Sequence, residues 1–277
     1  MNRSVVFLIT FSVLILFITL LYSYTIQGTE NVDSNGLTTP INNSKSSLDI
    51  SSEKIENNSI ENKIIKGEEI NHTAYSLLYS EEAEQPFWVN YTITRVMLEN
   101  PICKRKDNFR PDPLVSTFSA HPNDYKGSGF DRGHLCPAKD MEFSEVAMSE
   151  SFYMSNMSPQ HPSLNRGIWK RLEANVRKWT IEKDSISVYC GGLLDSISEF
   201  IGDNKVAVPK YYYKAILSIN DKEGIAFVFP NKKCDANMID YAISIDSLEQ
   251  LTHFNIFPEY DENNNFESTY NSDYWFK

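Results

Sequence analysis

The amino-acid sequence predicts an α+β fold with a mainly antiparallel sheet, and three observations indicate this class. Short runs of alternating apolar residues, typical of strands, recur from about residue 71 to the end of the chain. One longer segment, residues 168–179, instead places its apolar side chains at helical spacing. The hydrophobic content of 41% and the charged content of 23% fit a globular domain, and 277 residues suffice for one core plus extensions.

The expected elements follow one another along the chain as short strands and helices. Residues 87–94 alternate as a strand does, whereas residues 100–125 contain four prolines and predict a loop. Residues 127–130 predict a turn into a short strand, and residues 142–152 are compatible with a helix. The segment 168–179 carries apolar residues at 169, 172, 176 and 179, which share one helix face. Later strands are expected at 186–191, 211–219 and 224–229, and a short helix at 245–251.

Ahead of this domain, taken as residues 71–277, we expect a targeting segment at 1–26 and a disordered polar linker at 27–70. The apolar run from Val5 to Tyr22 is longer than a signal-peptide core and slightly shorter than the roughly 20 residues of a membrane span. An uncleaved membrane anchor is favoured over a cleaved signal, and Arg3 would keep the short end inside. These features predict an extracytoplasmic protein that is membrane-anchored, periplasmic or secreted, with the membrane as one partner.

Amino-acid composition predicts that the linker is disordered, and cysteine spacing argues about metal binding. Residues 31–63 are rich in Asn, Ser, Glu and Lys and contain no aromatic residue, so they cannot bury enough apolar surface to offset the entropy of ordering. The four cysteines form no C-x-x-C pair, which argues against a structural zinc site. Disulfides and buried free thiols both remain open.

The net charge of −11 argues against a uniformly basic, nucleic-acid-binding surface. The cations nevertheless gather around one stretch of sequence. They precede it, flank it or follow it on the expected helix: Lys104, Arg105, Lys106, Arg110, Lys126, Arg132, Lys139, Arg166, Lys170, Arg171, Arg177 and Lys178. Cations that contact a phosphate backbone bind any base sequence, so this local pattern fits a nonspecific partner better than the average charge does.

The stretch Asp131-Arg132-Gly133-His134 combines residue types that phosphodiester hydrolysis needs. Histidine is a common base near neutral pH, and arginine fits phosphate oxygens with a planar set of donors. Downstream, Asn165 offers an oxygen ligand of the kind that Mg²⁺ prefers. Glu173 and Arg177 are four residues apart and share a helix face. Taken singly, Asn165 also fits a helix N-cap, and Glu173 with Arg177 a solvated ion pair.

Taken together, these motifs resemble the DNA/RNA non-specific endonuclease family. The resemblance covers about residues 85–270 and rests on Asp131-Arg132-Gly133-His134, on Ser155-Asn156 with Pro159-Gln160, and on Asn165 followed by Trp169 and Leu172-Glu173. Several separate elements agree in order and spacing. The resemblance implies a ββα-metal finger embedded in the sheet.

The resemblance also implies the role of each site residue. His134 occupies the position of the general base, and Asn165 that of the only protein ligand of Mg²⁺, for which Mn²⁺ can substitute. Glu173 matches a carboxylate that holds metal-bound water, and Arg132 and Arg177 match cations near the phosphate and the leaving group.

The remaining positions of the resemblance support the site or contact substrate. Asn156 matches a supporting asparagine, and Asp131 is expected to be structural. Arg166 is expected to contact substrate, and Arg105 or Arg110 would supply an upstream substrate arginine, with Arg105 preferred.

The expected function is therefore Mg²⁺-dependent, sequence-nonspecific cleavage of DNA and RNA that leaves 5′-phosphate ends. A binding module that has lost catalysis and a phosphodiesterase for small molecules are the alternatives. The oligomeric state stays open, with a homodimer among the choices.

Overall fold

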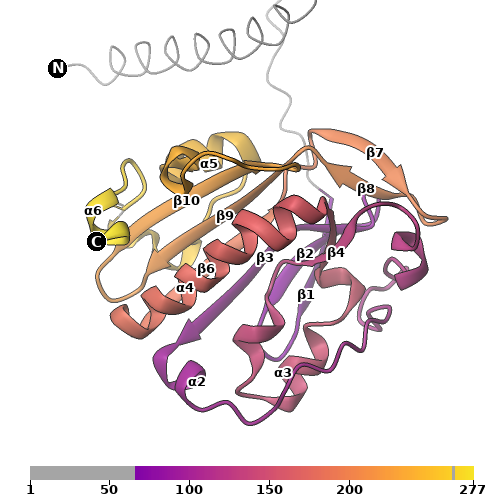
Figure 1. Ribbon diagram of the computed structural model, residues 1–277, viewed down its shortest axis with the longest axis horizontal. Helices are drawn as coiled ribbons and strands as arrows, with labels where there is room; N and C mark the ends of the chain where they lie inside the picture. The colour runs from indigo at the N-terminus through magenta and orange to yellow at the C-terminus, as the bar shows by residue number, and fades with distance from the viewer. Residues whose placement is uncertain (1–65, 264–265) are drawn as a thin grey trace, which may run out of the picture. The chain divides into compact units, whose positions relative to one another are not determined.

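An antiparallel sheet forms the centre of the molecule (Figure 1). The computed structural model describes residues 66–263 and 266–277. Among them, seven strands pair in the order β1-β2-β3-β6-β9-β10-β11, and every neighbouring pair is antiparallel. Their bounds are β1 Glu68–Asn71, β2 Ser76–Ser80, β3 Gln85–Thr94, β6 Ser185–Gly192, β9 Tyr211–Ser218, β10 Glu223–Pro230 and β11 Ala242–Ile243. This architecture confirms the predicted α+β class.

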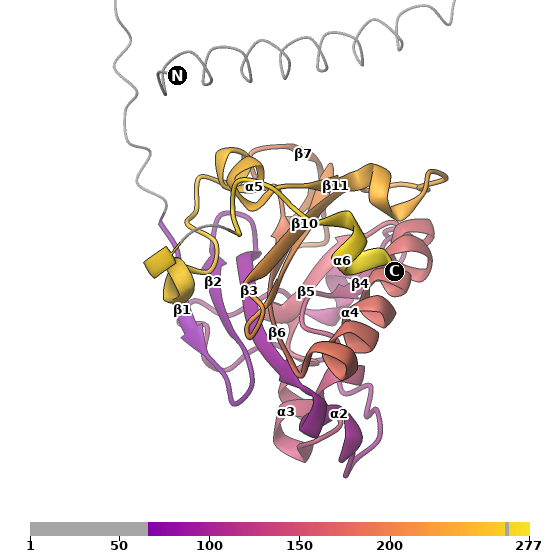
Figure 2. The same ribbon diagram turned by 90° about the vertical axis from the view of Figure 1, so that its left-hand side faces the viewer.

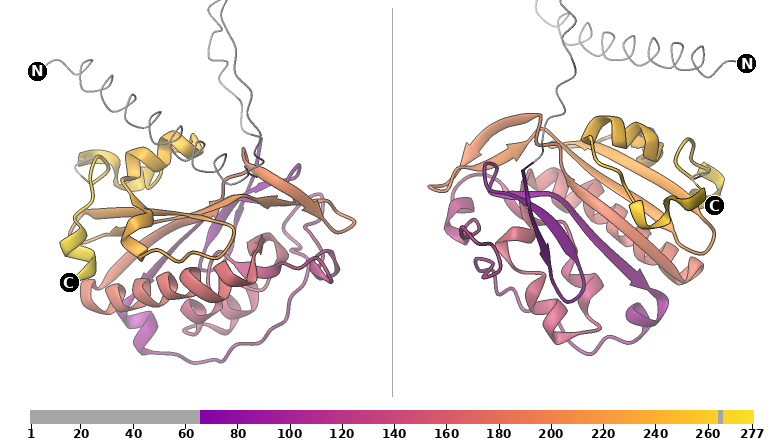
Figure 3. Two further views of the ribbon diagram at one scale, coloured as in Figure 1. Left: turned by 45° about the horizontal axis from the view of Figure 1, so that its top comes forward. Right: turned by 180° about the vertical axis from the view of Figure 1, so that it is seen from behind.

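Helices cover both faces of the sheet (Figures 2 and 3). The long helix α4 (Lys170–Lys183) lies across one face, and α5 (Ile245–Thr252) lies on the other. The shorter α2 (Arg95–Glu99), α3 (Glu145–Glu150) and α6 (Ser272–Phe276) complete the set of α-helices in the described part of the chain.

The apolar face of α4 is the one that the sequence spacing predicts. Trp169, Leu172, Val176 and Trp179 are all buried in the main core against the sheet. Full burial of one large apolar side chain contributes roughly 1.5–3 kcal/mol, so this row holds the helix in place. The helix ends at Lys183, where Asp184 takes a positive φ of 75° and turns the chain into β6.

Strand β9 shows how the sheet separates its two cores. Successive side chains of a strand point to opposite faces. Tyr212 and Ile216 accordingly join the core under α4, whereas Tyr213, Ala215 and Leu217 join the core under α5. The same alternation assigns Lys214, which is fully buried, to the α4 face.

Two small strand pairs stand apart from the main sheet. Strand β4 (Asp131–His134) pairs antiparallel with β5 (Met157–Gln160), and the chain then enters the π-helical segment η4 (Leu164–Trp169), which leads into α4. Together these elements form the expected ββα unit. A Cβ atom on Gly133 would lie 2.3 Å from the side chain of buried Gln160, so a larger residue here would have to displace that side chain. The second pair, β7 (Ile197–Ile201) with β8 (Val206–Pro209), projects beside it in Figure 1.

The predicted elements agree with the structure to within a few residues. The strands expected at 87–94, 186–191, 211–219 and 224–229 correspond to β3, β6, β9 and β10, and the three expected helices to α3, α4 and α5. Strand β5 was not predicted, because Met157-Ser158-Pro159-Gln160 has neither alternation nor β-branched residues.

The domain was expected to begin at Asn71, whereas the first strand, β1, begins three residues earlier, at Glu68. The targeting segment and nearly all of the linker lie outside the described residues. All four cysteines, Cys103, Cys136, Cys190 and Cys234, are free thiols.

Candidate active site

Asp131, at the start of β4, organises the segment that carries Asn165. Its carboxylate accepts hydrogen bonds from Asn165 Nδ2 at 2.9 Å and from the Arg166 guanidinium at 2.8 and 2.6 Å. Burial would raise the pKa of Asp131, but the hydrogen bonds from Arg166 and Asn165 lower it below its usual value. Because the Asn165 amide nitrogen is used in this way, its carbonyl oxygen is left to face a ligand. An amide oxygen is the kind of ligand that fits a hard divalent cation such as Mg²⁺, which keeps several of its waters and needs few protein ligands.

Asn165 lies on irregular helix and not at a regular N-cap. Its backbone N–H donates to His161 O at 3.0 Å, and the π-helical turn contains a kink at Gly167. Such wide turns occur mainly as short interruptions at functional sites. The turn explains how Asn165 can contact β4 while Trp169, four residues later, is already packed in the core.

His134 is the last residue of β4, and aromatic side chains pack against it. Its ring meets Phe109 and Phe152 edge-on, at centroid distances of 5.6 and 5.0 Å. Its Nε2 atom is buried and has no hydrogen-bond partner among the described residues. Burial, together with the charges of Arg105 and Arg132, lowers the pKa of His134 to about 3. The imidazole is therefore neutral at neutral pH, which is the state that can accept a proton.

The two upstream arginine candidates have different surroundings. The Arg105 guanidinium lies 5.0 Å from the Phe152 ring centroid, beside His134, and pairs with Asp107 at 2.7 Å. Arg110 instead donates to Ser149 O at 2.9 Å and stacks 4.0 Å over the Tyr153 ring, so it braces its loop against α3. Of the two, the structure brings Arg105 close to His134.

Like Arg105, Arg132 packs against one of the two aromatic rings that contact His134. Its guanidinium carbon lies 4.1 Å above the Phe109 ring, while the residue itself is exposed to solvent. Strand alternation places Arg132 and His134 on one face of β4 and Asp131 on the other. An exposed guanidinium thus stands next to the neutral imidazole.

Glu173 and Arg177 are partly buried, so they are not the solvated pair that their spacing also allowed. Arg177 Nη1 pairs with Asp140 Oδ1 at 2.8 Å. Burial raises the pKa of Glu173 to about 7; Lys214, Arg177 and a hydrogen bond from Trp169 oppose this shift, and Asp140 adds to it. The site therefore includes two residues that the motif comparison did not select, Asp140 and Lys214.

Asn156 is fully buried and acts on the backbone next to His134. Its Oδ1 accepts from Cys136 N at 2.8 Å, and its Nδ2 donates to Cys136 O and Ser151 O, both at 2.8 Å. In addition, Leu135 N donates to Asn156 O at 3.1 Å. This geometry fits a supporting residue that holds the chain after β4.

Half of the clustered cations are neutralised by acidic neighbours. Within the described residues, six of the twelve pair with a carboxylate within 4.0 Å: Arg105, Lys106, Lys139, Arg166, Arg177 and Lys178. The other six form no such pair with a described residue: Lys104, Arg110, Lys126, Arg132, Lys170 and Arg171. The basic surface is thus narrower than the sequence indicated.

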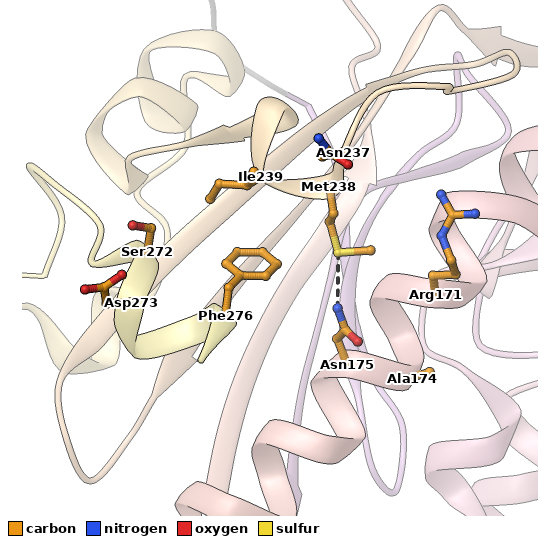
Figure 4. A pocket seen from close by; sticks show the side chains of 9 residues that line it. All are labelled: Arg171, Ala174, Asn175, Asn237, Met238, Ile239, Ser272, Asp273 and Phe276. Atoms are coloured by element: carbon orange, nitrogen blue, oxygen red, sulfur yellow. Dashed lines mark hydrogen bonds between the residues drawn. The ribbon is translucent and has the colours of Figure 1, made fainter.

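A pocket of about 650 Å³ lies between α4, η5 (Met238–Tyr241) and α6 (Figure 4). Arg171 and Asn175 line it from α4, Met238 from η5, and Asp273 and Phe276 from α6. Asn175 Nδ2 donates to Met238 Sδ at 3.3 Å across one end. The predicted site residues do not line this pocket, so it is not the place where they meet.

Comparison with known proteins finds relatives of this chain among nucleases. A family model described as DNA/RNA non-specific endonuclease matches residues 53–263. The mitochondrial nuclease EXOG of Mus musculus is 34% identical over 209 residues, which is 69% of this chain and 57% of that protein. Mitochondrial endonuclease G of Homo sapiens is 31% identical over 195 residues, 65% of this chain and 66% of that protein. The chain thus spans less than two thirds of the length of EXOG.

The fold has a counterpart among solved structures. A chain from the crystal structure of the EndoG/EndoGI complex has a TM-score of 0.62 and 28% sequence identity to this one. The superposition covers 68% of this chain and 85% of that chain. The likeness therefore extends over most of the part of the chain that the structure describes.

The extracytoplasmic, membrane-anchored location predicted from the N-terminus is wrong. EXOG, endonuclease G and the Saccharomyces cerevisiae relative, which is 32% identical over 207 residues, are all mitochondrial nucleases. Apolar N-terminal segments serve several targeting routes, so length and a single arginine could not identify the compartment. In residues 66–263 and 266–277 no helix is both long and apolar enough to span a membrane. The run from Val5 to Tyr22 lies outside the described residues.

Proposed function

Because this chain belongs to the DNA/RNA non-specific endonuclease family, we propose that it is a Mg²⁺-dependent endonuclease that cleaves DNA and RNA without sequence preference and leaves 5′-phosphate ends. One observation carries the proposal: a neutral imidazole at His134, near the guanidinium groups of Arg105 and Arg132, ends the strand whose first residue, Asp131, holds Asn165. A base, cations for phosphate and an oxygen ligand are the parts that phosphodiester hydrolysis requires.

His134 serves as the base in this proposal. Its imidazole is neutral, so a ring nitrogen can take a proton from an attacking water. Arg132 and Arg105 supply positive charge on the same side, where negative charge grows on the phosphoryl oxygens. Their charges also keep the imidazole neutral until it receives the proton, because a second cation beside them is unfavourable.

Asn165 would hold the metal through its side-chain oxygen. Asp131 orients that amide by accepting from its nitrogen, and Arg166 fixes Asp131 from the other side. A bound Mg²⁺, or Mn²⁺ in its place, supplies a Lewis acid that stabilises charge on the phosphoryl and leaving oxygens. Glu173 and Arg177 lie further along the same helix, where a carboxylate can order water and a guanidinium can meet the departing oxygen.

The proposed substrate is a polymer, held by its phosphates. Lys126, Arg132, Lys170 and Arg171 stand near the motif and form no ion pair with a described carboxylate. Contacts of this kind carry no base-sequence information and weaken steeply with salt. A dinucleotide would use few of them, so long DNA should be cleaved with a much higher kcat/KM than a dinucleotide.

The proposal is tested by nicking of supercoiled plasmid in Mg²⁺ and in EDTA. We expect nicking in Mg²⁺, none in EDTA, and labelled 5′-phosphate ends. His134→Ala should lower turnover by more than a thousandfold, within the order of magnitude of general base catalysis, about 10²–10⁴-fold. His253→Ala, at an exposed histidine beyond α5, is the matched control and should keep full activity. Full activity of His134→Ala, or nicking that persists in EDTA, would contradict the proposal.

A further inference from the structure

Lys214 is a fully buried lysine within an apolar row of β9. Its neighbours in the row, Tyr212 and Ile216, pack in the core under α4, which crosses this part of the sheet in Figure 1. Across the sheet it pairs with Cys190 of β6, which is also buried. An ammonium group at such a position is costly to desolvate, and a charged residue on an apolar face marks a functional constraint.

The contacts of Lys214 do not offset that cost. Nζ donates to Leu135 O at 3.4 Å and to Tyr91 OH at 3.5 Å, both long for hydrogen bonds. It also lies 4.6 Å from the centroid of the Trp169 ring. Among the described residues Lys214 forms no ion pair with a carboxylate within 4.0 Å, although its charge acts on Glu173 and Asp140. The lysine therefore does not act as half of a buried ion pair.

These contacts join the two segments on which the proposed site depends. Leu135 directly follows His134, and its carbonyl also accepts from Cys190 Sγ at 3.2 Å. Trp169 belongs to the turn that carries Asn165, and its Nε1 donates to His134 O at 3.3 Å. One ammonium group thus contacts the peptide after the base and the ring that anchors the metal-binding turn.

We propose that Lys214 is a positioning residue for catalysis. From its buried place in the core, it sets the spacing between the His134 strand and the Asn165 turn. The inference rests on the proposed function. The charge of Lys214 also acts on the carboxylate of Glu173, and Asp140 and Arg177 are the other charged groups that act on it. Lys214 is fully buried and does not reach the solvent-exposed side of the site, so it acts through its neighbours.

The opposing explanation is that Lys214 only stabilises the fold. The two explanations predict opposite changes in stability. Because Lys214 makes no ion pair within 4.0 Å, an apolar side chain of similar shape should remove the cost of desolvating its charge without loss of stability. Lys214→Met keeps the stem and removes the charge and the donor, so a positioning role predicts an unchanged or higher Tm together with lower activity.

The experiment compares wild type, Lys214→Met and Lys210→Met in the full chain. Lys210 is exposed just before β9, and its replacement removes the same charge from the surface. We expect Lys214→Met to keep the wild-type Tm or exceed it, to lower kcat on plasmid DNA at least tenfold, and to leave KM within twofold. Lys210→Met should match wild type in kcat and Tm.

A third variant, Trp169→Phe, tests whether Lys214 and Trp169 both act on the spacing between the His134 strand and the Asn165 turn. It keeps a ring in the core and removes the hydrogen bond to His134 O. If Lys214 and Trp169 hold the same spacing, the double variant Lys214→Met/Trp169→Phe should have a kcat only slightly below that of the less active single variant, because effects of coupled residues do not add.

Each outcome decides the inference. The inference is overturned if Lys214→Met has the wild-type kcat, does not fold, or loses activity only as far as its lower Tm explains. It is also overturned if the losses of kcat in the double variant are fully multiplicative. Wild-type protein that does not cleave DNA in Mg²⁺ would instead remove the proposed function, and the same assay separates the two failures.

Discussion

The burial of His134 predicts that the fold loses stability as the solution becomes acidic. Burial lowers the pKa of this imidazole from 6.5 to about 3. Above pH 6.5 the group is neutral in both the folded and the unfolded chain, so it contributes no difference. As the pH falls from 6.5 toward 3, the unfolded chain binds the proton and the folded chain does not, and stability is lost.

The magnitude follows from the pKa shift. Each pH unit between the two pKa values is worth about 1.4 kcal/mol, so lowering the pH from 6.5 to 5 should cost about 2 kcal/mol through His134 alone. His134→Gln removes the titrating group and keeps a polar side chain of similar length. The variant should therefore lose about 2 kcal/mol less than wild type over this interval.

The assay is urea unfolding at pH 7, 6 and 5, followed by fluorescence of the buried tryptophans. The difference in unfolding free energy between wild type and His134→Gln cancels the contributions of the other titrating groups. His253→Asn, which replaces an exposed histidine with φ of 61° by a residue that tolerates this conformation, should retain the wild-type slope. Parallel slopes for wild type and His134→Gln would refute the claim that the imidazole is desolvated and neutral.

Three further predictions concern the residues around this base. Burial raises the pKa of Glu173 to about 7, so if its ionised form is needed, kcat/KM should fall below about pH 7 in wild type, and Glu173→Gln should abolish that acid limb along with most of the activity. Asp131→Asn weakens the hold on the Asn165 amide, and the Mg²⁺ concentration for half-maximal activity should rise about tenfold, as for loss of one charged hydrogen bond; an unchanged Mg²⁺ titration would refute this. Asn156→Ala deletes three buried hydrogen bonds to backbone groups and should lower the free energy of unfolding by about 3 kcal/mol, with a urea midpoint equal to wild type as the contrary result.

Local patterns in the sequence determined most of the elements that frame the site. Period-2 alternation identified β3, β6, β9 and β10, and the helical spacing of Trp169, Leu172 and Val176 identified the buried face of α4. These predictions succeed because burial of one face imposes its period on the chain. The family was identified by resemblance, because the motif from Asp131 to His134 and the elements that follow it up to Glu173 agree with the family in order and spacing along the chain.

The N-terminal location was the clearest error, and its cause is physical. An apolar run reports affinity for a membrane or for a targeting receptor, and neither is specific for one compartment. The cation cluster was also overestimated. Sequence order brought the lysines and arginines together, but it could not show that six of the twelve have a carboxylate within 4.0 Å in the fold.

By itself, the amino-acid sequence determined the class of fold, the long helix α4, most of the strands, and the family. Only the tertiary structure decided that Arg105 lies beside His134 while Arg110 stacks on Tyr153, and that buried Lys214 joins Leu135 to Trp169. The reason is that residue type and periodicity are properties of neighbours along the chain. Burial, pKa and hydrogen-bond partners depend on residues far away in sequence, and only packing brings those residues together.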